Sequence, residues 1–445
     1  MKIAKILAIL SFVWAVLSCS KEMSSETTIQ SETATFSLKV SIADVAKYSA
    51  ETRLSDCTKA GESTIEPVLF GRDTVMYLVN HDDGWELMSA NKLAPQVLAM
   101  SERGHMTQAQ LFDCPPRAEY LERLVYFFSK IVSEKELDPD DRNSNWLNRS
   151  EGTRLDPIWV YVNSFTTSET IDIQEHLLNT QWYQYGPWYS RAPYNDSTLT
   201  THCYTGCTMV AAAQVLYYLH GYINKPTTAY SLSSCNAYVP NGDDSYLLLN
   251  DSNVSFSNNV SSTWASMPQR VEAGHTDAEY GCVSTLMVRL GRLLGAKYYR
   301  NGTGVHLTNI PTVFNTSEFS IQCSLATDFS KSRIREQVLA ENPLIMSVYH
   351  SVNDSLYSGH SIVVDGYKKV RETTTYVYEN SETHQLMFDE GLPVIREYVG
   401  INWGWLSTFN QENTAGAMTW YYLSSTFFDN PYNYNCVYET VYGFQ

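Results

Sequence analysis

Cys207 and His360 are the two residues of this sequence whose types best suggest covalent chemistry. A cysteine thiolate is a strong nucleophile, and an imidazole can take up the thiol proton and later return it to a leaving group. Asn402, further along the chain, carries a side-chain amide that can accept the second imidazole N–H and hold the ring in place. If the fold brings the three together, they predict acyl transfer through a thioester.

The segment around Cys207 predicts the N-terminus of a helix. Helix formers run from Thr208 to Leu219, and Gly221 follows as a stop signal. The free N–H groups and the positive dipole end of such a helix favour an anion, which lowers the pKa of a thiol. From this segment alone, a buried structural cysteine or a disulfide between Cys203 and Cys207 is an equally good interpretation.

His360 lies two residues before the apolar run Ile362–Val364, which predicts a strand that would fix the imidazole. A single histidine is more often structural than catalytic, so the order of the three residues matters. They follow one another in the Cys, His, Asn order of papain-like enzymes. Rival templates such as a G-x-S-x-G elbow or a P-loop do not occur. Neither C-x-x-C nor H-E-x-x-H occurs either, so we expect no metal and no cofactor.

Residues 36–153 are predicted to form a first, smaller domain with both strands and a helix. It ends in a polar stretch, residues 138–153, that is rich in turn formers and contains Arg142 and Arg149. Such an exposed linker with arginines is a natural place for proteolytic cleavage. The expected elements are strands at Val75–Val79, Trp85–Met88 and Pro95–Leu98 and a helix at Ala118–Leu137.

Residues 154–445 are predicted to form the larger domain, in which helical patterns precede strand patterns. That order indicates an α+β fold. Asp365–Gly366 is expected to be a hairpin turn. Besides the helix after Cys207, the expected elements are a helix at Val283–Leu294 and strands at Leu344–Tyr349, Ser361–Val364, Thr375–Tyr378, Tyr398–Ile401 and Met418–Tyr422.

The N-terminus predicts export and lipid anchoring. Lys2 and Lys5 precede an apolar run, Ile6–Leu17, that is too short to span a bilayer comfortably and is typical of a signal peptide. Val16 to Cys19 resembles a bacterial lipobox, which implies cleavage after residue 18 and a diacylglycerol on Cys19. Residues 19–35 would then be a tether. We expect anchoring in a bacterial outer membrane, on its periplasmic or surface face, or release after maturation.

The net charge of −17 makes nucleic acid a poor candidate partner, because a polyanion would be repelled. With 445 residues, 44% of them hydrophobic, the chain can bury more than one sizeable core.

The segments around the three candidate residues resemble motifs of the streptopain family of cysteine peptidases. Gly206–Gln214 resembles its nucleophile motif, Gly359–Tyr367 its histidine motif and Asn402–Trp405 its third motif. Further similar segments are Leu178–Gln184, Pro193–Asn195 and Trp264–Pro268, and residues 77–100 resemble the inhibitory propeptide.

This resemblance implies a papain-like catalytic domain, preceded by a propeptide domain that inhibits it. It implies that Gln184 donates to the oxyanion hole together with the Cys207 N–H, that Asn402 orients His360, and that Trp403 shields this pair from water. The expected partners are protein or peptide substrates, the chain's own propeptide, and a membrane through the lipid. Trp405 is expected to be a core residue.

The chain departs from the family pattern at two places. Thr208–Val210 stands where the family usually has Val-Ala-Thr, and Leu406–Ser407 stands where it usually has glycines. The second change would place a bulkier loop beside the substrate cleft. Two alternatives to a peptidase stay open at this point: an inactive or inhibitory relative that binds proteins, and another thiol acyl-transfer enzyme, such as a transglutaminase or an amidase.

Overall fold

The chain has a mixed α+β fold built on a large antiparallel sheet. The sheet has twelve strands, and most of them follow the order β1-β2-β3-β4-β16-β15-β13-β12-β17-β11, with β5 and β14 pairing with β13. Residues 38–445 form one compact unit. The computed structural model describes residues 39–53, 63–130, 159–220, 231–232, 235–242, 244–257, 264–353, 356–405, 419–423 and 437–445.

The first part of the chain forms an antiparallel meander that is accompanied by helices, as expected. Its apolar strand residues are buried, among them Leu78, Trp85 and Leu87. The strand expected at Pro95–Leu98 begins at Val97, because Pro95 has no N–H to donate to a ladder. The elements are α2 (Ile42–Arg53), β1 (Thr64–Phe70), β2 (Asp73–Asn80), β3 (Trp85–Ser89), β4 (Val97–Ser101), α3 (Gln108–Leu111) and α4 (Pro115–Lys130).

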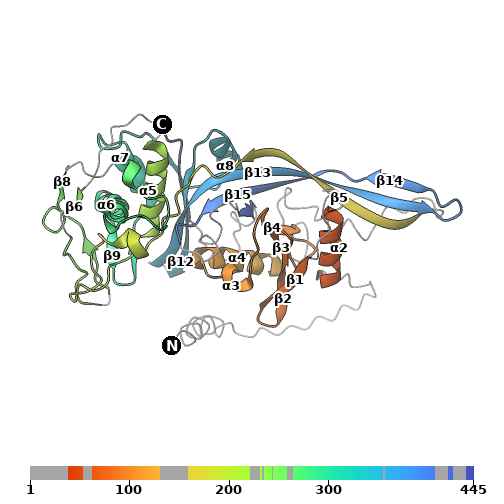
Figure 1. Cartoon of the computed structure of the whole chain (residues 1–445), viewed down its shortest axis with the longest axis horizontal. Helices are drawn as coiled ribbons and strands as arrows, with labels where there is room; N and C mark the ends of the chain where they lie inside the picture. The colour runs from red at the N-terminus through yellow and green to blue at the C-terminus, as the bar shows by residue number, and fades with distance from the viewer. Residues whose placement is uncertain are drawn as a thin grey trace. The chain divides into compact units, whose positions relative to one another are not determined.

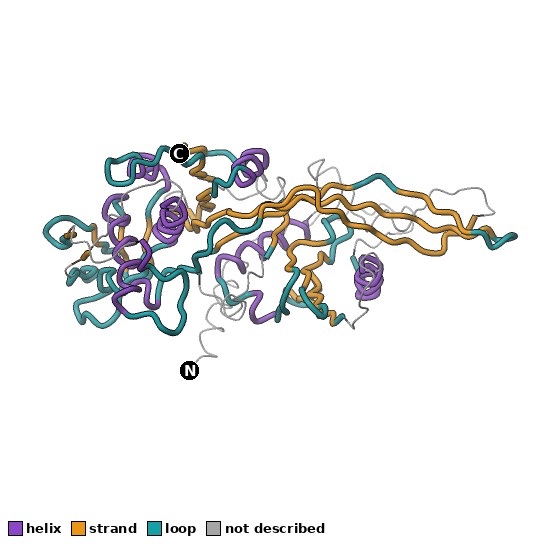
Figure 2. Tube along the Cα trace, turned by 45° about the horizontal axis from the view of Figure 1, so that its top comes forward, coloured by secondary structure: helices purple, strands orange, loops and turns teal. Residues whose placement is uncertain are grey.

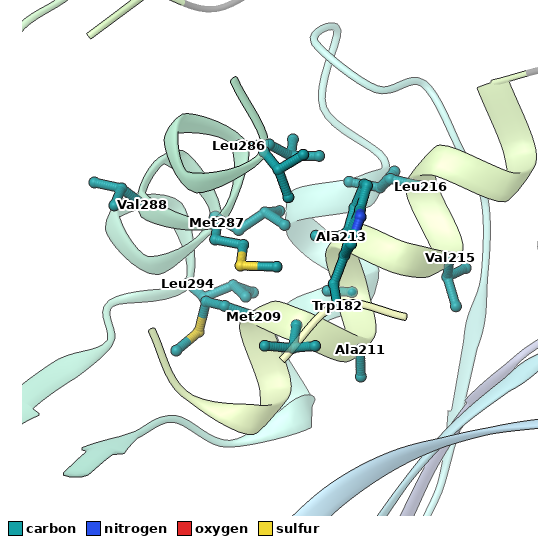
Figure 3. Close-up of a cluster of buried hydrophobic side chains, with 14 of the residues drawn as sticks. Trp182, Met209, Ala211, Ala213, Val215, Leu216, Leu286, Met287, Val288 and Leu294 are labelled. Atoms are coloured by element: carbon teal, nitrogen blue, oxygen red, sulfur yellow. The ribbon is translucent and has the colours of Figure 1, made fainter. Parts of the chain in front are cut away.

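Two helices lie in the hydrophobic core of the second part of the chain, which follows residue 158. Helix α5 (Cys207–His220) packs against α6 (Asp277–Leu294), and Met209, Leu286 and Met287 are fully buried in the cluster that Figure 3 shows. Helix α6 begins earlier than expected because Thr276 and Glu279 form a capping box. The shorter helices are α7 (Ile310–Phe314) and α8 (Lys331–Leu339).

The later strands complete the sheet beside α5, and Figure 1 shows β12 next to this helix. Long strands dominate this part, and Figure 2 shows them running side by side. The strands of the main sheet are β5 (Trp159–Gln174), β11 (Ser324–Ala326), β12 (Leu344–Asn353), β13 (Leu356–Asn380), β14 (Leu386–Glu390), β15 (Val394–Asn402), β16 (Trp420–Tyr422) and β17 (Val437–Tyr442). Small sheets contain β6 (Ser231–Leu232) with β8 (Phe256–Ser257), and β7 (Leu247–Leu248) with β9 (Lys297–Tyr299) and β10 (Gly302–Gly304).

The expectation of a hairpin turn at Asp365–Gly366 was wrong, because both residues lie inside β13. The strands expected at 361–364 and 375–378 are parts of this one strand. The glycine is needed for a close approach of two strands: a Cβ on Gly366 would lie 3.1 Å from the Cα of Gly400. Asp365 is fully buried, and its carboxylate lies 2.6 Å from His176 Nδ1.

The first and second parts of the chain share the main sheet. Strand β4 pairs antiparallel with β16 through Trp420↔Met100 and Tyr421↔Ala99. The predicted boundary between 153 and 154 lies outside the described residues and stays a prediction, as do the signal peptide, Cys19 and the tether. Within the described part of the chain, no helix is long and apolar enough to cross a membrane.

Candidate active site

Cys207 is the first residue of α5, as the helical pattern predicted. Gly206, directly before it, has φ +94°, and a Cβ at this position would lie 3.2 Å from Thr303 Cβ and collide with Met209. Only glycine fits this turn without strain. The turn and the helix together place the thiol where free backbone N–H groups favour an anion.

His360 lies in β13, and its charge changes the pKa of the Cys207 thiol. Burial by itself raises the pKa of Cys207, but the charge of His360 and hydrogen bonds from His360 and Ser361 outweigh it and lower the pKa to about 7. Such a thiol is substantially ionised near neutral pH, as a nucleophile must be. The sheet and the helix thus bring together two residues that are far apart in the sequence.

The imidazole is held from its other side by a main-chain carbonyl. His360 Nε2 lies 2.8 Å from the carbonyl oxygen of Trp403, which leaves Nδ1 as the ring nitrogen that can serve the thiol. The Trp403 side chain is buried, and its indole N–H donates to the Tyr421 hydroxyl at 3.1 Å. The main chain of Trp403 therefore contacts His360, while its indole packs against Tyr421, with ring centroids 5.2 Å apart.

Asn402 lies next to this carbonyl, but its side chain has other partners. Its Nδ2 donates to the Thr180 carbonyl at 2.8 Å and to Gln214 Oε1 at 2.9 Å, and its Oδ1 accepts from the Gly404 N–H at 3.1 Å. Gln214 Nε2 also donates to Asn402 Oδ1, at 3.3 Å. Among the described residues, the hydrogen-bond partners of Asn402 do not include His360. Asn402 thus bonds to the Gly404 N–H, in the turn that carries the Trp403 carbonyl.

Gln184 lies beside the loop that leads to the nucleophile. Its carbonyl accepts a hydrogen bond from the Thr205 N–H at 3.0 Å, and its side chain is buried. This pairing places the main chain of Gln184 beside Thr205, two residues before Cys207. The roles that the resemblance implies for Gln184, Asn402 and Trp403 stay predictions.

Trp405 lies beside His360, although it was expected in the core. It is partly exposed, and its ring centroid lies 6.4 Å from that of His360. Tyr185 and Tyr204 contact the same indole, with ring centroids at 5.6 and 6.4 Å. These three aromatic rings form an apolar wall beside His360.

Sequence reasoning assigned no role to Gln214 or Ser361. Gln214 is fully buried in an otherwise apolar helix, and a lone amide in such a run is the signal that could have identified it. Ser361 follows His360 directly and is also buried. Neither residue type is diagnostic by itself, so their partners had to come from the fold.

Two solved structures are similar to this chain. A fragment of prointerpain A from Prevotella intermedia is similar in structure, with a TM-score of 0.49 and 18% identity over 85% of this chain and 98% of that chain. Active interpain A from the same organism has a TM-score of 0.38 and 18% identity over 61% of this chain and 95% of that chain. No match is found among curated protein sequences.

A family comparison covers the catalytic segment directly. The model of the peptidase C10 family matches residues 182–411, slightly more than half of the chain. The matched range includes Gln184, Cys207, His360 and Asn402. The chain therefore belongs to the peptidase C10 family, the streptopain family of cysteine peptidases.

Proposed function

We propose that this cysteine peptidase is an endopeptidase that is exported, anchored by a lipid on Cys19, and made as an inactive precursor. The observation that carries the catalytic part is the pairing of Cys207 at the start of α5 with His360, which lowers the thiol pKa to about 7. A thiolate and an imidazolium that face each other supply both the nucleophile and the acid that peptide cleavage requires.

In the first half of the reaction, the Cys207 thiolate attacks the carbonyl carbon of the scissile peptide. The carbonyl oxygen becomes an oxyanion, which the Cys207 N–H and the Gln184 amide stabilise by about 3 kcal/mol per donor. The tetrahedral intermediate collapses as the C–N bond breaks. Protonated His360 gives its proton to the departing amine, and a thioester to Cys207 remains.

In the second half, a water molecule hydrolyses the thioester. Neutral His360 accepts a proton from the water as its oxygen bonds to the acyl carbon. The C–S bond then breaks, the carboxylic acid product leaves, and the Cys207 thiolate faces the His360 imidazolium again. The Trp403 carbonyl accepts from His360 Nε2 and keeps the ring facing the thiol.

Contacts of Tyr120 support the proposed inhibition by the first domain. The Tyr120 ring lies 5.8 Å from the Trp403 ring and 5.6 Å from the Tyr421 ring, measured between centroids. Its hydroxyl donates to the Tyr422 carbonyl at 3.0 Å, and the side chain is buried. Helix α4 therefore packs directly on the residue whose carbonyl holds His360.

The loop before α4 lies near the aromatic wall as well. The pKa of Tyr185 is raised to about 12, first by burial and then by neighbouring Tyr183, with further contributions from Cys114 and Asp113. These contributions indicate that Asp113 and Cys114 lie near Tyr185, the residue after Gln184. Removal of residues up to the 138–153 linker would expose this region to substrate.

A paired activity assay tests the catalytic and precursor proposals together. The full chain and a chain cleaved within 138–153 are compared on casein, on internally quenched peptides and on short peptides with free ends, with Cys207→Ala as the control. We expect cleavage inside the longer substrates by the cut chain only, and none by Cys207→Ala. Failure of the cut chain on a broad peptide library would overturn the proposed endopeptidase, and equal activity of the uncut chain would overturn the proposed inhibition.

Metabolic labelling tests the lipid anchor. Cells that express the full chain are fed an alkyne-tagged fatty acid, with Cys19→Ala as the matched control. Label on the wild-type chain alone supports anchoring through Cys19. Equal labelling of both chains, or of neither, contradicts it.

A further inference from the structure

A chain of three buried hydroxyl groups leads to the nucleophile. Ser361 Oγ lies 2.8 Å from Thr208 Oγ1 and within hydrogen-bond reach of Ser347 Oγ. The three side chains are between 0% and 3% exposed, so water does not compete for them. Ser347 and Ser361 are directly opposite each other in β12 and β13, and Thr208 follows Cys207 in α5. The hydroxyl chain therefore joins the helix of the nucleophile to the strand of its base.

The direction of the protons in this chain follows from counting donors. A serine hydroxyl has one proton and two acceptor lone pairs. Ser361 is hydrogen-bonded to Thr208 and Ser347, and its hydroxyl also lowers the pKa of Cys207, as a donor to the sulfur would. The main-chain N–H of Ser361 acts in the same direction. When the sulfur is a thiolate it can only accept, so Ser361 gives it its single proton. The Thr208 and Ser347 hydroxyls must then both donate to Ser361.

We propose that Thr208 and Ser347 orient the Ser361 hydroxyl toward Cys207, and that this oriented hydroxyl stabilises the thiolate. This inference rests on the proposed function in one respect only, namely that Cys207 reacts as the thiolate. Each hydroxyl that donates to the next polarises it, so the final O–H is a stronger donor than an isolated serine. Hydrogen bonds to a charged acceptor are also stronger than neutral ones.

The hydroxyl chain has a feature particular to this sequence. Thr208 stands where the related motif usually has valine, which has nearly the same shape but no hydroxyl. Without Thr208, Ser361 loses one of the two donors that determine where its proton points. Thr208 and Ser347 are thus positioning residues that act through Ser361, which itself touches the reacting sulfur.

The substitutions Thr208→Val, Ser347→Ala and Ser361→Ala test this inference. The readout is the rate of Cys207 alkylation by iodoacetamide between pH 5 and pH 9, followed on the full chain by mass spectrometry of the peptide that contains Cys207. This rate reports the thiolate fraction and needs no peptide cleavage. Thr285→Val on α6 is the matched control, because Thr285 is also buried and its hydroxyl donates to the Gly281 carbonyl at 2.7 Å.

We expect Ser361→Ala to slow alkylation at pH 6 by about tenfold, because it removes a hydrogen bond to a charged group. Thr208→Val and Ser347→Ala should each slow it by about threefold, and the double variant of Thr208→Val with Ser361→Ala should match Ser361→Ala alone. All rates should converge as the pH approaches 9, where the thiol is largely ionised in every variant. Thr285→Val should alkylate like the wild type.

A Thr208→Val chain that keeps the wild-type pH profile and unfolding temperature would overturn the proposal, even if the Ser361→Ala chain failed to fold. Additive effects of Thr208→Val and Ser361→Ala would overturn it too. Alkylation also separates this inference from the proposed function. If the profiles shift as expected while no variant cleaves peptides, the hydroxyl chain stands and the endopeptidase proposal fails.

Discussion

Replacement of Gln214 by leucine tests how the dyad is held. Gln214 is fully buried, and its Oε1 accepts from the Trp182 N–H at 3.3 Å and from Asn402 Nδ2 at 2.9 Å. Leucine has a similar volume, so Gln214→Leu leaves little cavity. It does leave the buried Trp182 N–H without its side-chain acceptor, and it removes both contacts between the two amides.

The magnitude follows from these losses. A buried N–H without a partner costs about 1–3 kcal/mol, and the loss of the amide pair adds about 1 kcal/mol. We therefore expect the free energy of unfolding to fall by about 2–4 kcal/mol. The turn at Asn402 should loosen and displace the Trp403 carbonyl from His360. A displacement of a positioning group by about 1 Å can cost up to a hundredfold in rate, so kcat should fall by at least about tenfold with little change in KM.

The assay combines urea unfolding with steady-state kinetics on the cut chain. Gln214→Leu and Asn402→Ala are measured singly and together, because residues in one hydrogen-bond network couple by about 0.5–3 kcal/mol. Gln337→Leu is the matched control, since Gln337 Oε1 accepts from the Gly443 N–H at 3.0 Å, away from the dyad. The control should cost stability without lowering kcat. Additive effects of the two site substitutions, or an unchanged kcat in Gln214→Leu, would refute the reasoning.

Three further predictions concern the ionisation of Cys207, the first domain, and the ion pair between His176 and Asp365. Peptide cleavage should decline as the pH falls through about 7, where Cys207 takes up its proton. His360→Ala should slow Cys207 alkylation at pH 7 by at least about tenfold, and an alkylation rate equal to that of the wild type would contradict the role of His360 in ionising the thiol. Tyr120→Ala in the uncut chain removes a buried aromatic side chain that contributes about 3–5 kcal/mol to stability, so alkylation of Cys207 should become faster. An unchanged alkylation rate would mean that the Tyr120–Trp403 contact does not restrict access to Cys207. Burial lowers the pKa of His176, but the charge of Asp365 outweighs burial and raises this pKa above its usual value of about 6.5. The charged pair therefore stabilises the fold fully below about pH 6.5, and this stabilisation is lost as the pH rises through the raised pKa. Because His176 is partly exposed, Asp365→Asn should cost about 1.5–3 kcal/mol in urea unfolding at pH 6 and less at pH 8, and an equal loss at both values would show that the pair is not ionic.

The main elements could be predicted because their signals are local. Helix α5 follows from its run of helix formers, and β2 and β3 follow from short apolar runs separated by a turn. Asp365–Gly366 shows where local signals fail. The same two residues form a hairpin turn in many chains, but here Gly366 lets β13 approach β15 and Asp365 binds His176, a residue 189 positions away. No local pattern contains that information.

The groups available for chemistry could be identified from the amino-acid sequence: a cysteine at a helix start, a histidine at the edge of an apolar run, and the order Cys207, His360, Asn402. Residue type and helix polarity are properties of a few neighbouring residues, so they can be read without a fold. How these groups are held depends on the packing of distant segments. His360 donates to the Trp403 carbonyl, and Asn402 pairs with Gln214. Amides and hydroxyls bond to whatever partner packing places within about 3 Å, and packing depends on the whole chain.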